Sequence, residues 1–144
     1  MRLAVLLGVE LLLSACGWAS PSANGTVSVQ GNPTLGTWTQ SVDGCEKVNG
    51  ITLLNHGTAV IAVSTDPVAG NSIELPNPSG GAPFQLFAQQ CQTLEVDAHY
   101  NGTIVTDYDK NEINDQEIDG SVSAVCVLPN GGTVTANATF SSCL

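Results

Sequence analysis

Oxygen-bearing side chains are concentrated between Asp107 and Glu117, where the sequence reads DYDKNEINDQE. Eight of the twelve acidic residues that follow Cys16 lie between Glu95 and Asp119. A Ca²⁺ ion takes about six to eight oxygen ligands, and carboxylate and amide oxygens at alternate positions could supply several of them. The candidate calcium ligands in this run are Asp107, Asp109, Asn111, Asp115 and Glu117.

The first half of this run has the spacing of an EF-hand loop, but the second half does not. Glu112 stands where the EF-hand has its turn glycine, and Ile118 stands where it has its closing glutamate. The flanking segments alternate as strands do, so we expect the tip of a β-hairpin. Asp and Asn are common turn residues, and charge on a loop keeps strand edges from associating. We therefore favour a solvated tip, with calcium binding as the alternative.

Glu95, Asp97 and His99 have the spacing of neighbours on one face of a strand. Such neighbours lie about 7 Å apart and rarely converge on one metal ion, so we expect a solvated face there. The sequence has no Gly-x-Ser-x-Gly or His-Glu-x-x-His motif and no phosphate-binding glycine loop. We therefore expect no catalytic residues and no enzymatic activity.

Four cysteines remain when Cys16 is set aside: Cys45, Cys91, Cys126 and Cys143. A zinc site is not indicated, because the sequence contains no Cys-x-x-Cys pair. If the chain is exported, an even number of cysteines together with a small core predicts two disulfides. Three pairings are possible, and the sequence does not select among them.

The N-terminal segment has the features of an export signal. Arg2 precedes a short apolar run, which Glu10 interrupts and which ends in LLLSAC at residues 11–16. This ending resembles the lipobox of bacterial lipoproteins, in which a leucine and two small residues precede the cysteine that receives the lipid. The resemblance implies that residues 1–15 are a signal peptide and that Cys16 is acylated, for example by palmitate. An ordinary secretory signal is the alternative.

The resemblance also implies a location in the bacterial cell envelope. Gly17 follows the cysteine where an aspartate would favour the inner membrane, so the family's sorting rule implies the outer membrane or the cell surface. Residues 16–25 are small, polar and proline-containing, which predicts a flexible tether. Residues 26–144 are expected to form one β-domain.

The charge of the chain limits its partners. After Cys16, twelve acidic side chains face only Lys47 and Lys110, and the formal net charge of the chain is −10. Such a field repels nucleic acid and anionic lipid headgroups. We therefore expect membrane attachment through the lipid and an unidentified protein partner. We expect no nucleic acid and no cofactor, with calcium as the possible exception.

From Thr26 onward, glycine and proline interrupt the chain at short intervals, and no apolar stripe has helical spacing. This pattern is typical of short strands. It predicts an all-β fold, an antiparallel β-sandwich or barrel of about seven to nine disulfide-stapled strands. In the first two thirds of the chain we expect strands near residues 26–30, 36–42, 50–55, 58–64 and 84–91.

The C-terminal third has the clearest alternation, which predicts a three-stranded meander with one buried face. If Val134 and Cys126 share that face, the numbers of paired residues must have an even sum. A loop at Asn130–Gly132 meets that condition, whereas a two-residue turn does not. The apolar positions are Leu94, Val96, Ala98, Tyr100, Ile104, Ile118, Val122, Ala124, Cys126, Leu128, Val134, Ala136, Ala138 and Phe140.

These features favour a lipid-anchored envelope β-domain with a structural or protein-interaction role, similar in style to small β-rich bacterial surface lipoproteins. The alternative function is a calcium-binding β module that uses the hairpin loop at 107–117. The sequence identifies neither the partner nor the sheet topology.

Overall fold

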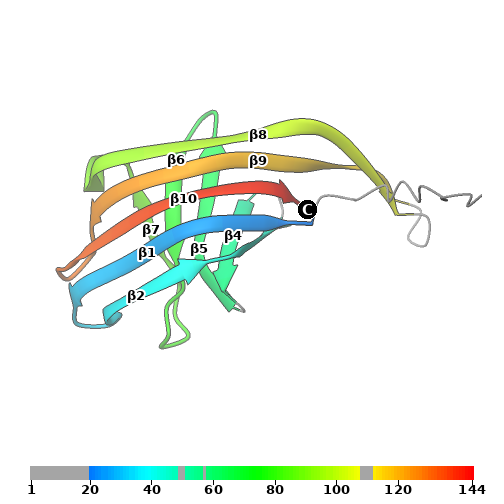
Figure 1. Ribbon diagram of the computed structural model, residues 1–144. Helices are drawn as coiled ribbons and strands as arrows, with labels where there is room; N and C mark the ends of the chain where they lie inside the picture. The colour runs from blue at the N-terminus through cyan, green and yellow to red at the C-terminus, as the bar shows by residue number, and fades with distance from the viewer. Residues whose placement is uncertain (1–19, 49–50, 57, 108–111) are drawn as a thin grey trace, which may run out of the picture.

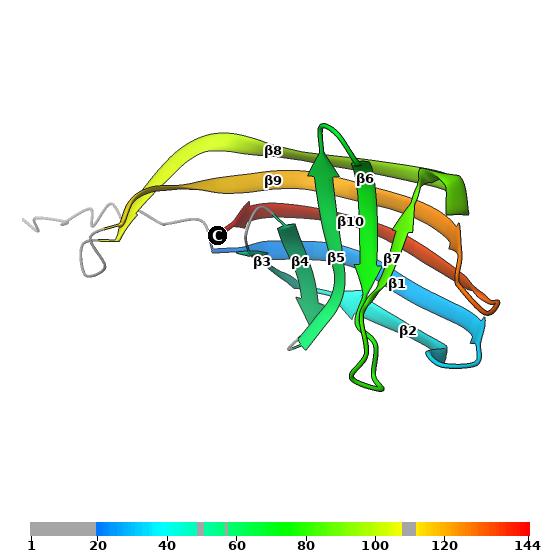
Figure 2. The same ribbon diagram turned by 180° about the vertical axis from the view of Figure 1, so that it is seen from behind.

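The computed structural model describes residues 20–48, 51–56, 58–107 and 112–144. In this part of the chain, ten strands form two five-stranded antiparallel sheets that pack face to face (Figures 1 and 2). The predicted all-β sandwich is therefore confirmed, with slightly more strands than the seven to nine expected. The strands of the two sheets run crosswise to each other.

Sheet A has the order β2 (Gly36–Val42), β1 (Ser22–Asn32), β10 (Thr133–Cys143), β9 (Glu112–Val127) and β8 (Cys91–Asp107). Sheet B has the order β3 (Gly44–Val48), β4 (Ile51–His56), β5 (Thr58–Asp66), β6 (Gly70–Leu75) and β7 (Phe84–Phe87). A short 3₁₀ turn, η1 (Ala88–Gln90), links β7 to β8.

Strands β3 and β6 are the two that the sequence pattern missed. Strand β3 has five residues at the edge of sheet B, of which only Cys45 is buried. In β6, Ile73 and Leu75 are the only alternating apolar residues. The strand expected at 84–91 ends at Phe87, where η1 begins.

The register of β9 and β10 confirms the predicted parity. Val134 pairs with Cys126 and Ala136 pairs with Ala124, so both pairs have an even sum. The loop lies one residue earlier than expected, because the Leu128 N–H donates to the Gly132 carbonyl at 3.0 Å. Asn130 takes the left-handed conformation (φ 64°) at the centre of this tight turn.

The hydrophobic core lies between the sheets and consists mainly of Val, Leu, Ile and Ala. Phe140 is buried opposite Gly120 on β9. A Cβ atom at Gly120 would overlap the Asp97 carbonyl and the Phe140 ring, so only glycine fits there. The largest fully buried side chains are Leu54, Ile61, Ile73, Leu75, Leu86, Val27, Val29, Val63, Val122 and Val134.

The two predicted disulfides are present, and the structure gives their pairing. Cys45–Cys143 joins edge strand β3 of sheet B to β10 of sheet A and closes a sequence separation of 98 residues. Cys91–Cys126 joins neighbouring strands β8 and β9 of sheet A, with a separation of 35 residues. Cys126 is buried in the core, as its parity predicts.

The tether prediction for residues 16–25 is wrong for its last part, because β1 begins at Ser22. Ser22 pairs with Ser141, and the pairing of β1 with β10 continues along the strand. Gly25 pairs with Ala138, and a Cβ at Gly25 would overlap the Asn137 carbonyl. Small residues occur here because two central strands approach closely, so a composition typical of linkers belongs to the sheet.

The β8–β9 hairpin extends beyond the rest of sheet A. Pairing of β10 with β9 stops at Cys143 and Ile118, whereas β8 and β9 remain paired as far as Asp107 and Glu112. The hairpin projects at the end of the domain where β1 begins and the chain ends (Figure 1). Asp107, Glu112 and Asp115 therefore belong to a projecting arm of the domain.

Candidate binding site at the edge of strand β8

Strand β8 forms one edge of sheet A, and no described strand pairs with its outer side. In an antiparallel ladder, successive residues direct their backbone groups alternately to the two sides. The Asp97 carbonyl lies against Gly120, so it points towards β9. The Val96 carbonyl instead accepts a hydrogen bond from Asn71 Nδ2 of β6 at 3.2 Å. The backbone groups of Ala98 and Tyr100, which share the parity of Val96, therefore face outward.

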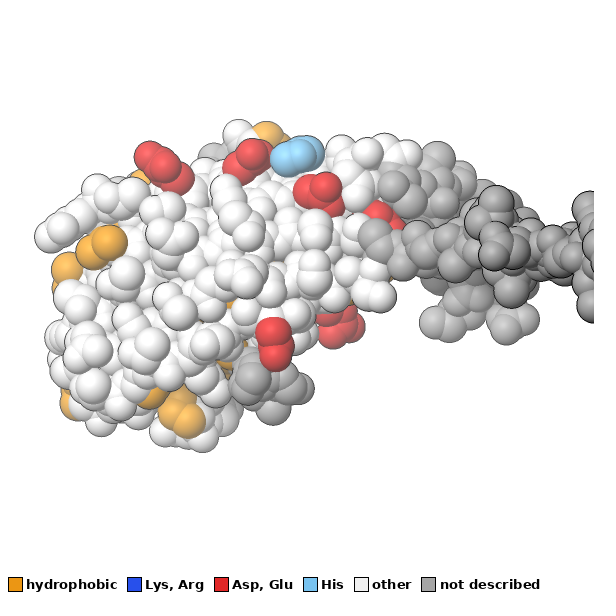
Figure 3. Space-filling view, in the orientation of Figure 1, with side chains coloured by type: hydrophobic (Ala, Val, Ile, Leu, Met, Phe, Trp, Pro, Cys, Tyr) orange, Lys and Arg blue, Asp and Glu red, His pale blue; other side chains and the backbone are white. Residues whose placement is uncertain are grey.

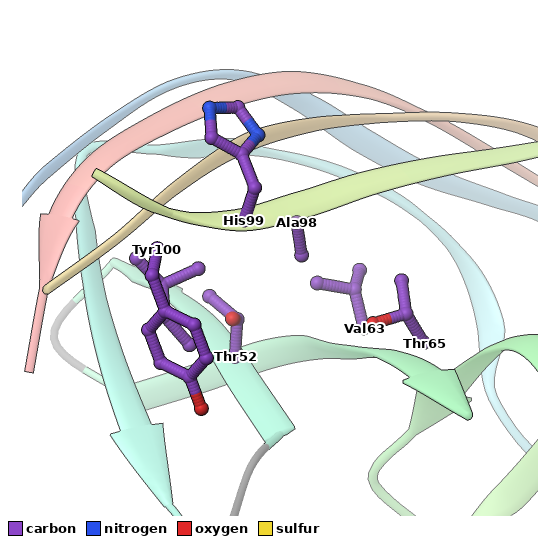
Figure 4. A pocket seen from close by; sticks show the side chains of 7 residues that line it. Thr52, Val63, Thr65, Ala98, His99 and Tyr100 are labelled. Atoms are coloured by element: carbon purple, nitrogen blue, oxygen red, sulfur yellow. The ribbon is translucent and has the colours of Figure 1, made fainter. Parts of the chain in front are cut away.

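A pocket of about 300 Å³ lies under this stretch of β8, between the two sheets. In Figure 4, Ala98 and Tyr100 point from β8 towards Thr52, Val63 and Thr65 of sheet B. This volume is at the lower end of the range for small-molecule sites and suits one or two amino-acid side chains. The lining residues are Thr52, Val63, Thr65, Ala98, His99, Tyr100 and Ile118.

Tyr100 forms the outer wall of the pocket. The alternation of apolar and polar residues along β8 predicts that the Tyr100 side chain faces inward. Figure 4 shows the ring on the inner side of β8. Tyr100 is nevertheless 60% exposed, although it lines the pocket. Lys47 Nζ lies 5.8 Å from the ring centroid and donates a hydrogen bond to the Gln116 carbonyl at 2.8 Å. This cation–π contact holds the ring against β3.

The opposite face of the same stretch carries exposed charge. Glu95, Asp97 and His99 lie on the outer face of β8 and are all exposed, as predicted for a solvated row. His99 Nδ1 lies 3.2 Å from Asp97 Oδ1. In Figure 4 the imidazole of His99 points away from the pocket, and Figure 3 shows acidic side chains on either side of a histidine along this edge.

Glu117, one of the candidate calcium ligands, lies in a hydrogen-bond network within sheet A. The side chain is buried, and its Oε2 accepts a hydrogen bond from Asn101 Nδ2 at 3.0 Å. Asn101 Nδ2 also donates to Asp119 Oδ1 at 3.0 Å, and the Ser142 N–H donates to the same oxygen at 2.8 Å. The network joins β8, β9 and β10 at the base of the projecting hairpin.

The other candidate ligands are only partly placed. Asp107 and Asp115 lie in the paired backbone of β8 and β9, while Asp109 and Asn111 fall outside the described residues. Among the described residues, no three His, Cys, Asp or Glu side chains are grouped so that they could hold a metal ion. Calcium binding at this tip remains a prediction, and Cys16 also lies outside the described residues.

Two further hollows are smaller. One of about 210 Å³ lies against Leu35, Trp38 and Val60, and one of about 220 Å³ lies against Leu53, Ala62 and Pro83. The residues that sequence reasoning missed are Asn71, Thr52 and Thr65, which reach the β8 edge from sheet B. Nothing in their local sequence marks them, since the packing of the sheets brings them to β8.

Comparison of the chain with protein-family models, with curated proteins and with solved structures finds no match. In the part of the chain that the structure describes, no helix has the length and apolar character needed to cross a membrane.

Proposed function

We propose that this protein is a lipid-anchored β-sandwich of the bacterial cell envelope that binds another protein and has no catalytic activity. The observation that carries the binding role is the edge of β8, where unpaired backbone, a pocket and an acidic row formed by the exposed Glu95 and Asp97 coincide. Extended peptides bind proteins by adding to such exposed sheet edges. The lipid anchor rests on the resemblance of residues 11–16 to a lipobox.

The position of β1 makes the anchor a short one. Ser22 is the first residue of β1 and lies six residues after Cys16. Six residues span at most about 22 Å, so an acylated Cys16 would hold the domain close to the bilayer. The end that carries Ser22, the chain end and the β8–β9 hairpin would then face the membrane (Figure 1).

Acyl labelling tests the anchor. The full chain is produced in bacteria with a labelled palmitate analogue, and the wild type is compared with the Cys16→Ser variant. We expect label and membrane fractionation for the wild type and the loss of both for the variant. Equal labelling of the two chains, or wild-type protein free of membranes, would refute the anchor.

Site-specific photo-crosslinking in intact cells tests the protein-binding role. A photoreactive residue replaces Glu95 on β8 or, as the control, Thr39 on β2 at the opposite edge of sheet A; both positions are exposed. We expect a discrete protein adduct from position 95 and none from position 39. Adducts from neither position, or from position 39 alone, would contradict binding at β8.

A calcium-binding module remains the second candidate function, and the hairpin register is the observation that favours it. Asp107 pairs with Glu112 across β8 and β9, so the strand pairing brings together acidic residues from the two sides of the hairpin loop. Carboxylate oxygens are the ligands that calcium prefers. Melting of the full chain in millimolar calcium and then in a chelator tests this function.

Ligand at 100 times its dissociation constant adds about 2.7 kcal/mol to the free energy of unfolding, which raises the melting temperature by several degrees. We expect this shift to disappear in Asp109→Ala and not to be reproduced by sodium. Identical melting in calcium and chelator would exclude the calcium function.

A further inference from the structure

Building on the protein-binding role proposed above, we infer that the partner docks as an extended strand beside β8, with alternating basic and apolar side chains. Three features of the stretch from Glu95 to Tyr100 carry this inference. The backbone edge offers hydrogen bonds, the pocket lies on its inner side, and the acidic row lies on its outer side.

The backbone determines where the docked strand pairs. The Val96 carbonyl already accepts a hydrogen bond from Asn71. The open part of the edge therefore begins at Ala98 and continues through Tyr100. These residues can exchange N–H and carbonyl hydrogen bonds with an added strand, as at other exposed sheet edges. The turn between β5 and β6 emerges beyond β8 in Figures 1 and 2 and would lie under the docked segment.

The pleat of the sheet determines which side chains reach the pocket. Residues level with Ala98 and Tyr100 on an added strand would point towards sheet B, as those two residues do in Figure 4. There they would meet the side chains of Val63, Ile118, Thr52 and Thr65. The pocket of about 300 Å³ can therefore take an aliphatic side chain, which would pack against Val63 and Ile118.

The outer face determines the charge of the alternate positions. Residues of an added strand that lie level with Asp97 would point to the same side as Glu95 and Asp97, both of which are exposed. Opposite charges at neighbouring cross-strand positions stabilise a sheet. A second copy of this chain is disfavoured as the occupant, since two β8 edges would bring like-charged rows together. A strand that presents Lys or Arg outward is complementary.

The test uses the full chain with both disulfides intact, in detergent, and a fluorescent peptide of sequence Lys-Val-Lys-Leu-Lys-Val-Lys. Binding is followed by fluorescence anisotropy. The matched peptides carry Glu in place of every Lys, or N-methyl groups on alternate backbone nitrogens. We expect saturable binding of the basic peptide, with at least tenfold weaker binding of both matched peptides.

Three protein variants locate the site. Asp97→Asn should weaken binding about threefold to fivefold, as one cross-strand charge pair does. Glu46→Gln on β3 removes the same charge from another exposed strand and should leave binding unchanged. Ala98→Pro removes an outward N–H and should weaken binding at least tenfold. Proline is tolerated where a strand N–H faces solvent, and the melting temperature of Ala98→Pro verifies its folding.

Equal losses in Asp97→Asn and Glu46→Gln would overturn the site, because they would indicate diffuse attraction to an acidic surface. Unimpaired binding of the N-methylated peptide, or of folded Ala98→Pro, would overturn strand addition. If position 95 crosslinks in cells but no peptide binds, this inference fails while the proposed function stands. If the basic peptide binds as expected but no adduct forms, the proposed function fails instead.

Discussion

The strands of sheet A contain 7 to 17 residues, whereas those of sheet B contain 4 to 9. Long ladders give sheet A many cross-strand pairs, with β10 at its centre between β1 and β9. Sheet B is a meander of short strands, and its first strand is joined to β10 by Cys45–Cys143. Sheet A is therefore determined mainly by its own pairing, and sheet B depends more on links to sheet A.

Removal of each disulfide is expected to give the largest changes in the free energy of unfolding, and it tests this difference between the sheets. Replacing Cys45 and Cys143 by Ala should lower the free energy of unfolding by about 4.7 kcal/mol, because the bond closes a loop of 98 residues. Replacing Cys91 and Cys126 should cost about 3.8 kcal/mol for a loop of 35 residues. Urea denaturation of both double variants measures the two losses. A larger loss for the pair within sheet A would reverse the comparison.

The loops of the two sheets also differ in how strongly their asparagine hydrogen bonds are expected to stabilise them, and the stronger case is again in sheet A. Asn32 is buried in sheet A; its Nδ2 donates to the carbonyls of Pro129 and Gly131, and its Oδ1 accepts from the N–H groups of Thr34 and Leu35. Asn32→Ala should cost about 2–4 kcal/mol, because four partly buried hydrogen bonds are lost together.

Asn77, in the loop between β6 and β7 of sheet B, provides the matched exposed case. It accepts from the Ser79 N–H and donates to the Ala82 carbonyl, and both hydrogen bonds are exposed to solvent. Asn77→Ala should cost less than about 1 kcal/mol, since water replaces the lost partners. Comparable losses for the two variants would show that the turn of sheet A is not specially stabilised.

Two glycines test how closely the strands of each sheet pack. A methyl group at Gly120 of sheet A would overlap the backbone of Asp97, whereas one at Gly44 of sheet B would meet the side chain of Asn55. Gly120→Ala should cost about 1–3 kcal/mol. Gly44→Ala should cost less, because an amide side chain can rotate away. Thermal melting measures both, and an equal effect would contradict the difference in rigidity.

The smallest expected effect concerns the β5–β6 turn. Backbone N–H groups of Ala69 and Val68 donate to Asp66 and lower the pKa of its carboxyl from the ordinary value of 3.8. The stabilisation is therefore complete above pH 3.8 and is lost as the pH falls through the lower pKa of the folded state. Asp66→Ala should destabilise the protein slightly near pH 7 and have no effect below that lower pKa.

An NMR titration of the Asp66 carboxyl carbon measures this pKa directly. The β9–β10 turn of sheet A carries no titratable side chain from Leu128 to Gly132, so its amide protection should not change over the same pH range. An ordinary Asp66 pKa would remove this difference between the turns.

The sequence predicted sheet A better than sheet B for a physical reason. One face of β9 and β10 is buried along most of its length, so alternation specifies both the strands and the parity of Val134 and Cys126. Short strands such as β3 and β6 bury too few residues to show a period. The composition of the segment from Ser22 to Gly25 predicts a tether although the segment is paired, because its partner strand is more than a hundred residues away in the sequence.

The candidate site divides in the same way. The exposed row of Glu95, Asp97 and His99 was predictable, since all three share one strand. The pocket was not, because it forms only where β8 crosses strands β4 and β5, and neither Thr52 nor Thr65 carries a local signal. Asparagine is common in turns, so Asn71 likewise carries no signal of a binding site. Its hydrogen bond to the Val96 carbonyl depends on the packing of the sheets.

The central place of β10 also bears on the order in which the chain can fold. During synthesis from the N-terminus, β1 emerges first, but its partner β10 contains residues 133–143 and emerges last. Until then sheet A lacks its middle strand, and Cys45 lacks the cysteine with which it pairs. Contacts between such distant segments slow folding. The pairing of sheet A therefore cannot be completed before residues 133–143 have been synthesised.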